Sequence, residues 1–198
     1  MGCRAGRGPA HVPPLRVPGP DGRRWLPRVG AAITAAVEEP GNDAPFIRAW
    51  AEREPGRLIG KGHPAGDFLE AHRWRVLEER RGLLRIRAHL PEHVKNPRGQ
   101  LFGGFTPTYV DLVALFTVRT EEALPDRRFR SWLATTNMRV DYFEPILGPE
   151  FDIESRLVKS RGRTRFVETR FLDLEGELAV FSTTTIREIP LDRPLGDA

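Results

Sequence analysis

One segment constrains the fold of this 198-residue chain more than any other. Residues 105–123 read as a helix, and between Tyr109 and Val118 apolar side chains occupy almost every side of it. A surface helix carries a single apolar stripe, whereas a helix that is apolar all round is buried. We therefore expect the rest of the domain to enclose this helix.

Strand patterns with a period of two residues flank the helix. Before it, residues 70–78 and 84–90 alternate between apolar and polar side chains. After it, four further strands are expected, over residues 132–143, 151–160, 163–172 and 178–188. Turn signals at residues 161–162 and 175–176 separate the last three, which predicts an antiparallel meander. The order of elements predicts an α+β domain with one helix packed on one antiparallel sheet.

Residues 1–30 differ in composition from the rest, with six Gly, six Pro and six Arg and no continuous apolar run. Such a segment cannot bury enough surface to offset the entropy lost on ordering, so it predicts a disordered tail. The missing apolar run argues against a secretory signal. The arginines fit a mitochondrial transit peptide, but the prolines argue against the amphipathic helix that it needs.

The remaining chain divides by pattern into a helical segment, one domain and a short tail. These parts are residues 31–67, with helices over 31–39 and 45–54 and a loop over 55–67; residues 68–190; and residues 191–198.

Charge and cysteine content exclude several classes of protein. The net charge is +4, but residues 1–30 alone carry +5, so the expected domain is close to neutral and we expect no nucleic-acid partner. No window approaches 18 uncharged apolar residues, so we expect no membrane span. Cys3 is the one cysteine, which excludes a disulfide framework and favours a reducing compartment, here taken as the cytoplasm.

Three motifs of common cofactor and metal sites fail on spacing. The run from Gly56 to Lys61 is one residue shorter than a phosphate-binding loop. The Gly-Lys-Gly at residues 60–62 follows no strand, so it is not a dinucleotide-binding fingerprint. His89 and His93 are four residues apart, but Pro91 breaks the helix that a zinc site would need. We expect no metal and no resident cofactor.

The informative segment runs from Asn96 to Asp111. Gly103 and Gly104 lie just before the buried helix, whose start offers unpaired N–H groups and the positive end of a dipole to an oxygen that gains negative charge. Asp111 follows seven residues after the glycine pair, within the apolar part of the helix. A buried carboxylate is costly, so Asp111 either serves catalysis, bonds a neighbouring backbone group or faces a solvated dimer seam.

Asn-x-x-Gly-x-Leu-x-Gly-Gly, followed by an acid at Asp111, resembles the hotdog-fold acyl-CoA thioesterases of the phenylacetate-degradation (PaaI-like) branch, within the 4-hydroxybenzoyl-CoA thioesterase superfamily. The resemblance covers residues 68–188 and includes Met-Arg-Val-Asp-Tyr-Phe-Glu-Pro at 138–145 and Ser-Arg-Gly-Arg at 160–163. It implies a curved antiparallel sheet wrapped around one long central helix. It also implies a homodimer or homotetramer with acyl-CoA bound between subunits, so that coenzyme A enters as part of the substrate.

The resemblance also assigns roles to individual residues. The N–H of Gly103 polarises the thioester carbonyl, and Asp111, from the opposite subunit, activates water or attacks directly. Asn96 positions the water or the acid, and Thr135 orients the water. The implied substrate contacts are Phe102, Gly104, Gln100, Arg161, Gly162 and Arg163, the last three at a hairpin that reaches the phosphates of coenzyme A.

Phe102 departs from the family pattern, which has His before the glycine pair. Because Phe donates no hydrogen bond, Gly103 acts alone or with Gln100, and loss of an oxyanion donor costs about 10²–10³ in rate elsewhere. Two hypotheses therefore stand: an acyl-CoA thioesterase, favoured by Asp111, and an acyl-CoA-binding protein with little hydrolysis, favoured by Phe102. A hydratase is disfavoured, because no Asp/His pair is evident. The Arg hairpin can also be an ordinary charged turn.

Removal of residues 1–30 is expected to leave folding, assembly and activity intact, because the segment lacks the apolar residues needed to join a core. Thermal unfolding and size-exclusion chromatography of the truncated and full chains test this. A truncated protein that fails to fold, or that melts many degrees lower, would show that the segment is structural.

Overall fold

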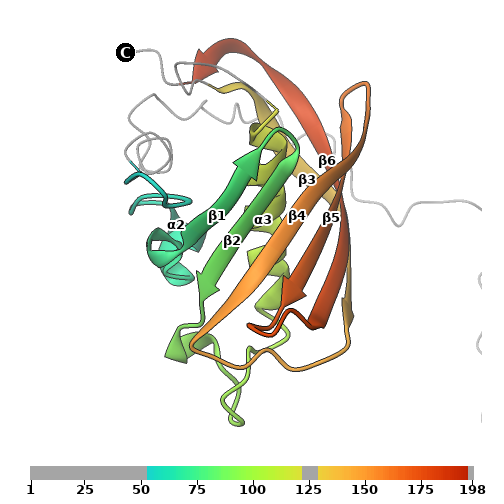
Figure 1. Ribbon diagram of the computed structural model, residues 1–198. Coiled ribbons are helices and arrows are strands. Elements are labelled where there is room, and N and C mark those ends of the chain that lie inside the picture. The colour runs from blue at the N-terminus through green and yellow to red at the C-terminus, as the bar shows by residue number, and fades with distance from the viewer. Residues whose placement is uncertain (1–52, 122–128, 196–198) are drawn as a thin grey trace, which may run out of the picture. The chain divides into compact units, whose positions relative to one another are not determined.

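The computed structural model describes residues 53–121 and 129–195 (Figure 1). Three sequence predictions lie outside these residues: the tail over 1–30, the helix over 31–39 and nearly all of the helix over 45–54.

Six strands form one curved antiparallel sheet, and helix α3 packs against it (Figure 1). The strands are β1 (Arg75–Arg80), β2 (Leu83–His89), β3 (Phe129–Tyr142), β4 (Glu150–Arg161), β5 (Thr164–Leu172) and β6 (Leu178–Leu195). Their order across the sheet is β1-β2-β4-β5-β6-β3, which makes β1 and β3 the edge strands. The predicted α+β class and the predicted meander of β4, β5 and β6 are confirmed.

Several predicted boundaries were wrong. The first strand begins at Arg75, because residues 71–73 form a 3-10 turn, η1, after Glu70, whose φ is +52°. Helix α3 spans Thr106–Arg119 and ends four residues before the predicted limit. Strand β6 continues to Leu195, beyond the predicted end at 188, because its later residues pair with the start of β3. No helix among the described residues is long and apolar enough to cross a membrane.

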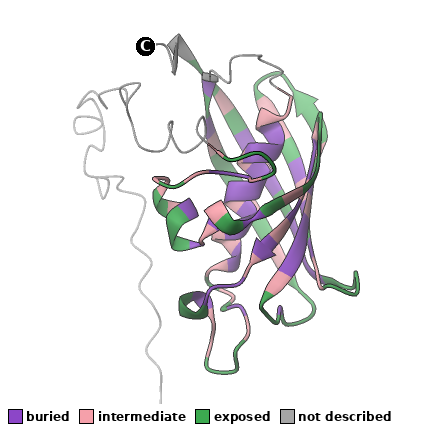
Figure 2. Cartoon of the chain, turned by 60° about the vertical axis from the view of Figure 1, so that its left-hand side comes forward, coloured by how far each residue is buried: buried purple, intermediate pink, exposed green. Residues whose placement is uncertain are grey.

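Helix α3 is buried on most sides, as its sequence predicts (Figure 2). One stripe, formed by Asp111, Leu115 and Arg119 at intervals of four residues, is only half-buried. The stripe faces β3: the Arg119 guanidinium donates to the Ser131 carbonyl over 2.7 Å. Beyond its first turn, the half-buried residues of the helix therefore lie along this boundary with an edge strand.

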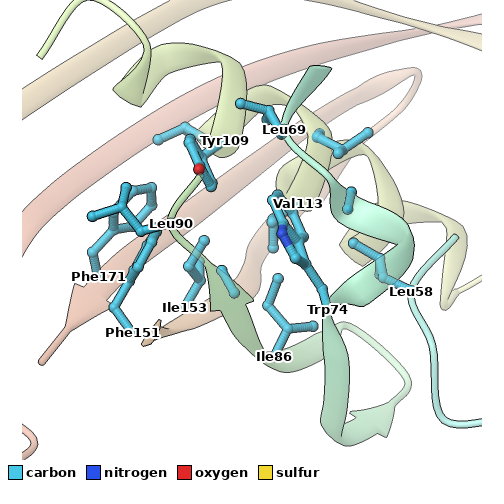
Figure 3. Packing of buried hydrophobic residues seen from close by; sticks show 14 of the residues in the cluster. Leu58, Leu69, Trp74, Ile86, Leu90, Tyr109, Val113, Phe151, Ile153 and Phe171 are labelled. Carbon is cyan, nitrogen blue, oxygen red and sulfur yellow. The ribbon is translucent and has the colours of Figure 1, made fainter. Parts of the chain in front are cut away.

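Aromatic side chains fix α3 against the sheet (Figure 3). Trp74 stacks on Tyr109 with ring centroids 5.2 Å apart, and Tyr109 in turn contacts Phe151 at 5.5 Å. The Tyr109 hydroxyl donates to the His89 carbonyl on β2 over 3.3 Å, and burial raises the pKa of this hydroxyl above its usual value. Loss of a ring from such a cluster costs about 3–5 kcal/mol, so these contacts set the helix position firmly.

A short helix, α2 (Pro64–Phe68), lies in the segment that was predicted to be a loop. Its first turn is closed by His63, whose Nδ1 accepts the N–H of Gly66 over 3.0 Å. Histidine is not a usual cap, which is why the sequence pattern missed this helix. Burial lowers the pKa of His63 below its ordinary value of 6.5, although Asp67 opposes this.

Acidification is expected to weaken α2. Because the folded-state pKa of His63 is lowered, the unfolded chain binds the proton more tightly, so the free energy of unfolding falls as pH drops below about 6.5. Protonation of Nδ1 also removes the acceptor of the cap. His63→Asn keeps an acceptor and does not titrate, so its melting temperature should fall less than that of the parent between about pH 7 and pH 5. If the melting temperatures of the two proteins fall equally over this pH range, the prediction is wrong.

Candidate functional site

The turn that leads into α3 carries unpaired backbone N–H groups. The Phe105 N–H donates to the Phe102 carbonyl over 2.9 Å, and the Thr106 N–H donates to the Gly103 carbonyl over 3.3 Å. Within the described residues, the N–H groups of Gly103 and Gly104 have no protein acceptor. They lie at the positive end of the helix dipole, where an oxygen with partial negative charge is stabilised.

Tyr142, at the end of β3, ties this turn to the sheet. Its hydroxyl donates to the Gly103 carbonyl over 2.8 Å. The bond fixes the peptide plane between Gly103 and Gly104 and hence the direction of the Gly104 N–H. Sequence reasoning assigned Tyr142 no role, although it lies within the run at 138–145 that carried the family resemblance.

Phe102 covers the glycine turn rather than donating to it. A Cβ atom on Gly104 would lie 2.6 Å from Cε1 of the Phe102 ring, so the ring position requires glycine there. The ring contacts Phe105 edge to face, at 5.5 Å between centroids, and remains half exposed. The side chain at this position thus supplies apolar surface beside the free N–H groups.

Asn96 and Gln100 hold the loop that precedes the turn. Oδ1 of Asn96 accepts the N–H groups of Arg98 and Gln100 at 2.9 and 3.2 Å, and its Nδ2 donates to Oε1 of Gln100 over 3.2 Å. Both ends of the Asn96 side chain are therefore used inside the loop. Asn96 therefore holds the conformation of the loop that leads to Gly103.

Asp111 lies close to Thr135, which the resemblance predicts to orient the water. The Thr135 hydroxyl donates to Oδ1 of Asp111 over 2.5 Å, which links α3 to β3. The expectation that Asp111 is buried was wrong: it is half-buried, because it lies on the helix stripe that faces the edge strand. Its second carboxylate oxygen has no hydrogen bond within the described residues and can accept a proton or a water.

A cavity of about 290 Å³ adjoins the glycine turn. Gly103 and Gln100 line it together with the link between β3 and β4, and Asp111 does not. On β3, Thr135 bonds to Asp111 and Tyr142 bonds to Gly103. These two residues are seven positions apart, which is roughly 20 Å along a strand. One chain thus carries an N–H site and a carboxylate site in two separate places.

The predicted phosphate-binding residues are at the turn between β4 and β5. Arg161 and Arg163 are exposed and flank Gly162, whose φ of +56° suits a tight turn. Neither guanidinium has an ion-pair partner among the described residues, whereas Arg165 pairs with Glu188 over 2.5 Å. In strand register this turn lies level with Thr135, since Arg165 and Thr135 both pair with Ile186 of β6.

Comparison with solved structures identifies the fold. A thioesterase from Haemophilus influenzae matches with a TM-score of 0.55 and 12% identity, over 65% of this chain and 85% of that one. A hypothetical thioesterase from Streptococcus pneumoniae, solved with coenzyme A, matches with a TM-score of 0.52 and 16% identity, over 61% of this chain and 88% of that one. A Streptococcus mutans protein bound to acetyl CoA matches with a TM-score of 0.51 and 16% identity, over 61% of this chain and 91% of that one.

No family model matches the chain. No curated protein matches it either. The similarity therefore lies in the structure, and at these identities it establishes the fold alone: the described domain has the hotdog fold, as these solved structures do.

Proposed function

We propose that this protein hydrolyses the thioester of an acyl-CoA to a carboxylate and free coenzyme A. The main support for the proposal is the pair of unpaired N–H groups at Gly103 and Gly104 at a helix start, since Gly103 also lines a cavity. Such donors stabilise the oxyanion that forms when a thioester carbonyl is attacked. The hotdog fold supports the proposal, since proteins of this fold have been solved with coenzyme A and acetyl CoA.

Each residue has a defined task in the proposed reaction. Asp111 takes a proton from water as the water oxygen attacks the carbonyl carbon, or attacks that carbon itself. The carbonyl oxygen becomes an oxyanion held by the N–H groups of Gly103 and Gly104, and Tyr142 keeps the peptide that carries the Gly104 N–H in place. The C–S bond then breaks, the carbonyl re-forms, and the thiolate of coenzyme A leaves. In the first route it takes up the proton that Asp111 received from water. In the second route the acyl group is left on Asp111 as an anhydride, and water hydrolyses the anhydride to the carboxylate, regenerates Asp111 and supplies the proton to the thiolate.

Thr135 and Asn96 act as positioning residues. The Thr135 hydroxyl holds one oxygen of Asp111 and leaves the other directed at water. Asn96 keeps the loop before the glycine turn in shape. An Asp and a Thr have each been replaced by Ala in structures of the Streptococcus pneumoniae thioesterase, the two residue types that meet here.

The proposed active site is shared between two copies of the chain. Gly103 lines the cavity and Asp111 does not, so a second copy must bring its carboxylate to the first copy's turn. β3 is a long edge strand beside Asp111, and an open edge of this length is usually paired or covered. A two-fold pairing of β3 strands would create two equal sites per homodimer, and a homotetramer would pair two such dimers.

The unpartnered arginines support coenzyme A as the leaving group. Arg161 and Arg163 present two guanidinium groups from one turn, and guanidinium forks match phosphate geometry. We assign them to the phosphates of coenzyme A. The resemblance of the motif at Asn96–Asp111 supports the further proposal that the protein belongs to the PaaI-like branch.

A second candidate function is acyl-CoA binding with little hydrolysis. Phe102 favours it, because the side chain beside the oxyanion donors supplies no hydrogen bond. The two functions differ in whether free thiol is released from acyl-CoA. If the protein binds acyl-CoA but releases no free thiol even at high enzyme concentration, its function is acyl-CoA binding rather than hydrolysis.

Asp111→Asn is expected to lower kcat for acyl-CoA hydrolysis by about 10²–10⁴, because the carboxamide cannot accept the proton. Binding should change little, since the Gly103 and Gly104 donors remain. Thiol release and calorimetric binding measure the two effects. Asp173→Asn is the matched control, since Asn still accepts the Glu175 and Glu177 N–H groups at the β5–β6 turn. An Asp111→Asn enzyme that keeps more than about a tenth of parental kcat would exclude Asp111 as base or nucleophile.

Mixing two inactive variants tests the shared site. Asp111→Ala removes the acid, and Gly103→Pro removes one N–H donor. After joint refolding at equal amounts, about half of the dimers are mixed and each has one intact site, so about a quarter of parental activity should return. Each variant refolded alone is the control. A protein that is monomeric at micromolar concentration and still active would rule out a shared site.

A further inference from the structure

The cavity beside Gly103 has walls held by backbone hydrogen bonds. The N–H groups of Phe143 and Glu144 both donate to the Ala179 carbonyl, at 2.9 and 3.1 Å. On the opposite side, the Leu101 N–H donates to the Ile146 carbonyl over 2.9 Å. The link between β3 and β4 is thus tied both to β6 and to the segment before the glycine turn. The cavity is pre-formed, as binding sites for small molecules generally are.

The size of the cavity suits a compact group. Its volume of about 290 Å³ is at the lower end of the range for ligand pockets, and the cavity is partly open. The wall is largely apolar, with Leu101, Ile146 and Val180 buried around it.

The charge at the cavity is negative. Glu144 is the one carboxylate among the described lining residues, and none of them is Lys or Arg. Glu144 is exposed and has no ion-pair partner within the described part of the chain. Among the described lining residues of one copy, an anionic group would meet this carboxylate without a compensating cation, which disfavours this cavity as the site for the phosphates of coenzyme A. The two free guanidinium groups lie elsewhere, at the β4–β5 turn.

We propose that this cavity is the acyl pocket and that Glu144 makes it selective for compact, uncharged acyl groups. The proposal rests on the proposed thioesterase function. The acyl carbonyl lies at the Gly103 turn, the rest of the acyl group enters the cavity, and coenzyme A extends away from it. An acyl group that ends in a carboxylate is disfavoured by repulsion from Glu144.

Hexanoyl-CoA and adipoyl-CoA test the charge selectivity, because their acyl chains are equally long and only the second ends in a carboxylate. The parent should have the higher kcat/KM with hexanoyl-CoA. In Glu144→Gln the ratio of kcat/KM for adipoyl-CoA over hexanoyl-CoA should rise by about 10-fold, the scale of one like-charge contact near a protein surface. Glu177→Gln, at the exposed β5–β6 turn, is the matched control and should leave the ratio unchanged.

An unchanged ratio in Glu144→Gln would overturn the proposal, as would hydrolysis of palmitoyl-CoA with a kcat/KM equal to that for hexanoyl-CoA. If the parent hydrolyses none of these compounds, the proposed hydrolysis fails, but the pocket is still tested. The same ratio is then taken from the dissociation constants of hexanoyl-CoA and adipoyl-CoA by calorimetry. A Glu144-dependent ratio would support the pocket, and an unchanged one would overturn it.

Discussion

Burial of α3 is the interaction on which the rest of the structure depends. Its apolar side chains point in nearly all directions, so a flat sheet on one side would leave much of them in water. The sheet must therefore curve, and shifts of register in β1, β3 and β4 accompany the bending. The stack of Trp74 on Tyr109 then fixes the helix against β2 and the middle of the sheet.

The position of α3 determines both halves of the candidate site. The unpaired Gly103 and Gly104 N–H groups lie just before its start, with Gly103 at the cavity, and its half-buried stripe brings Asp111 to Thr135. In the proposed reaction, a helix held in place means that these groups need not reorganise when charge develops on a substrate oxygen, which is the condition for effective electrostatic stabilisation. Because Phe102 supplies no donor, the proposed oxyanion stabilisation rests on these backbone groups, alone or with Gln100.

Elements with strong local periodicity were predictable, and those that depend on distant partners were not. The alternation in β2, β4 and β5 predicted these strands to within one residue at each end. α2 was missed because its cap is a histidine, and the last part of β6 was missed because Pro190 and Pro194 are unusual in strands. That part pairs with the start of β3, which lies more than 50 residues earlier in the chain.

The sequence by itself determined that one apolar helix is enclosed by an antiparallel sheet, that a glycine pair opens this helix, and that an acid follows seven residues later. These are properties of spacing and of side-chain chemistry within a short stretch. Only the tertiary structure decided that Asp111 meets Thr135 at an open edge and that Tyr142, 39 residues from Gly103, holds its carbonyl. It also decided that Glu144 lies at the cavity. These depend on strand order and register, which arise from packing between segments far apart in the chain.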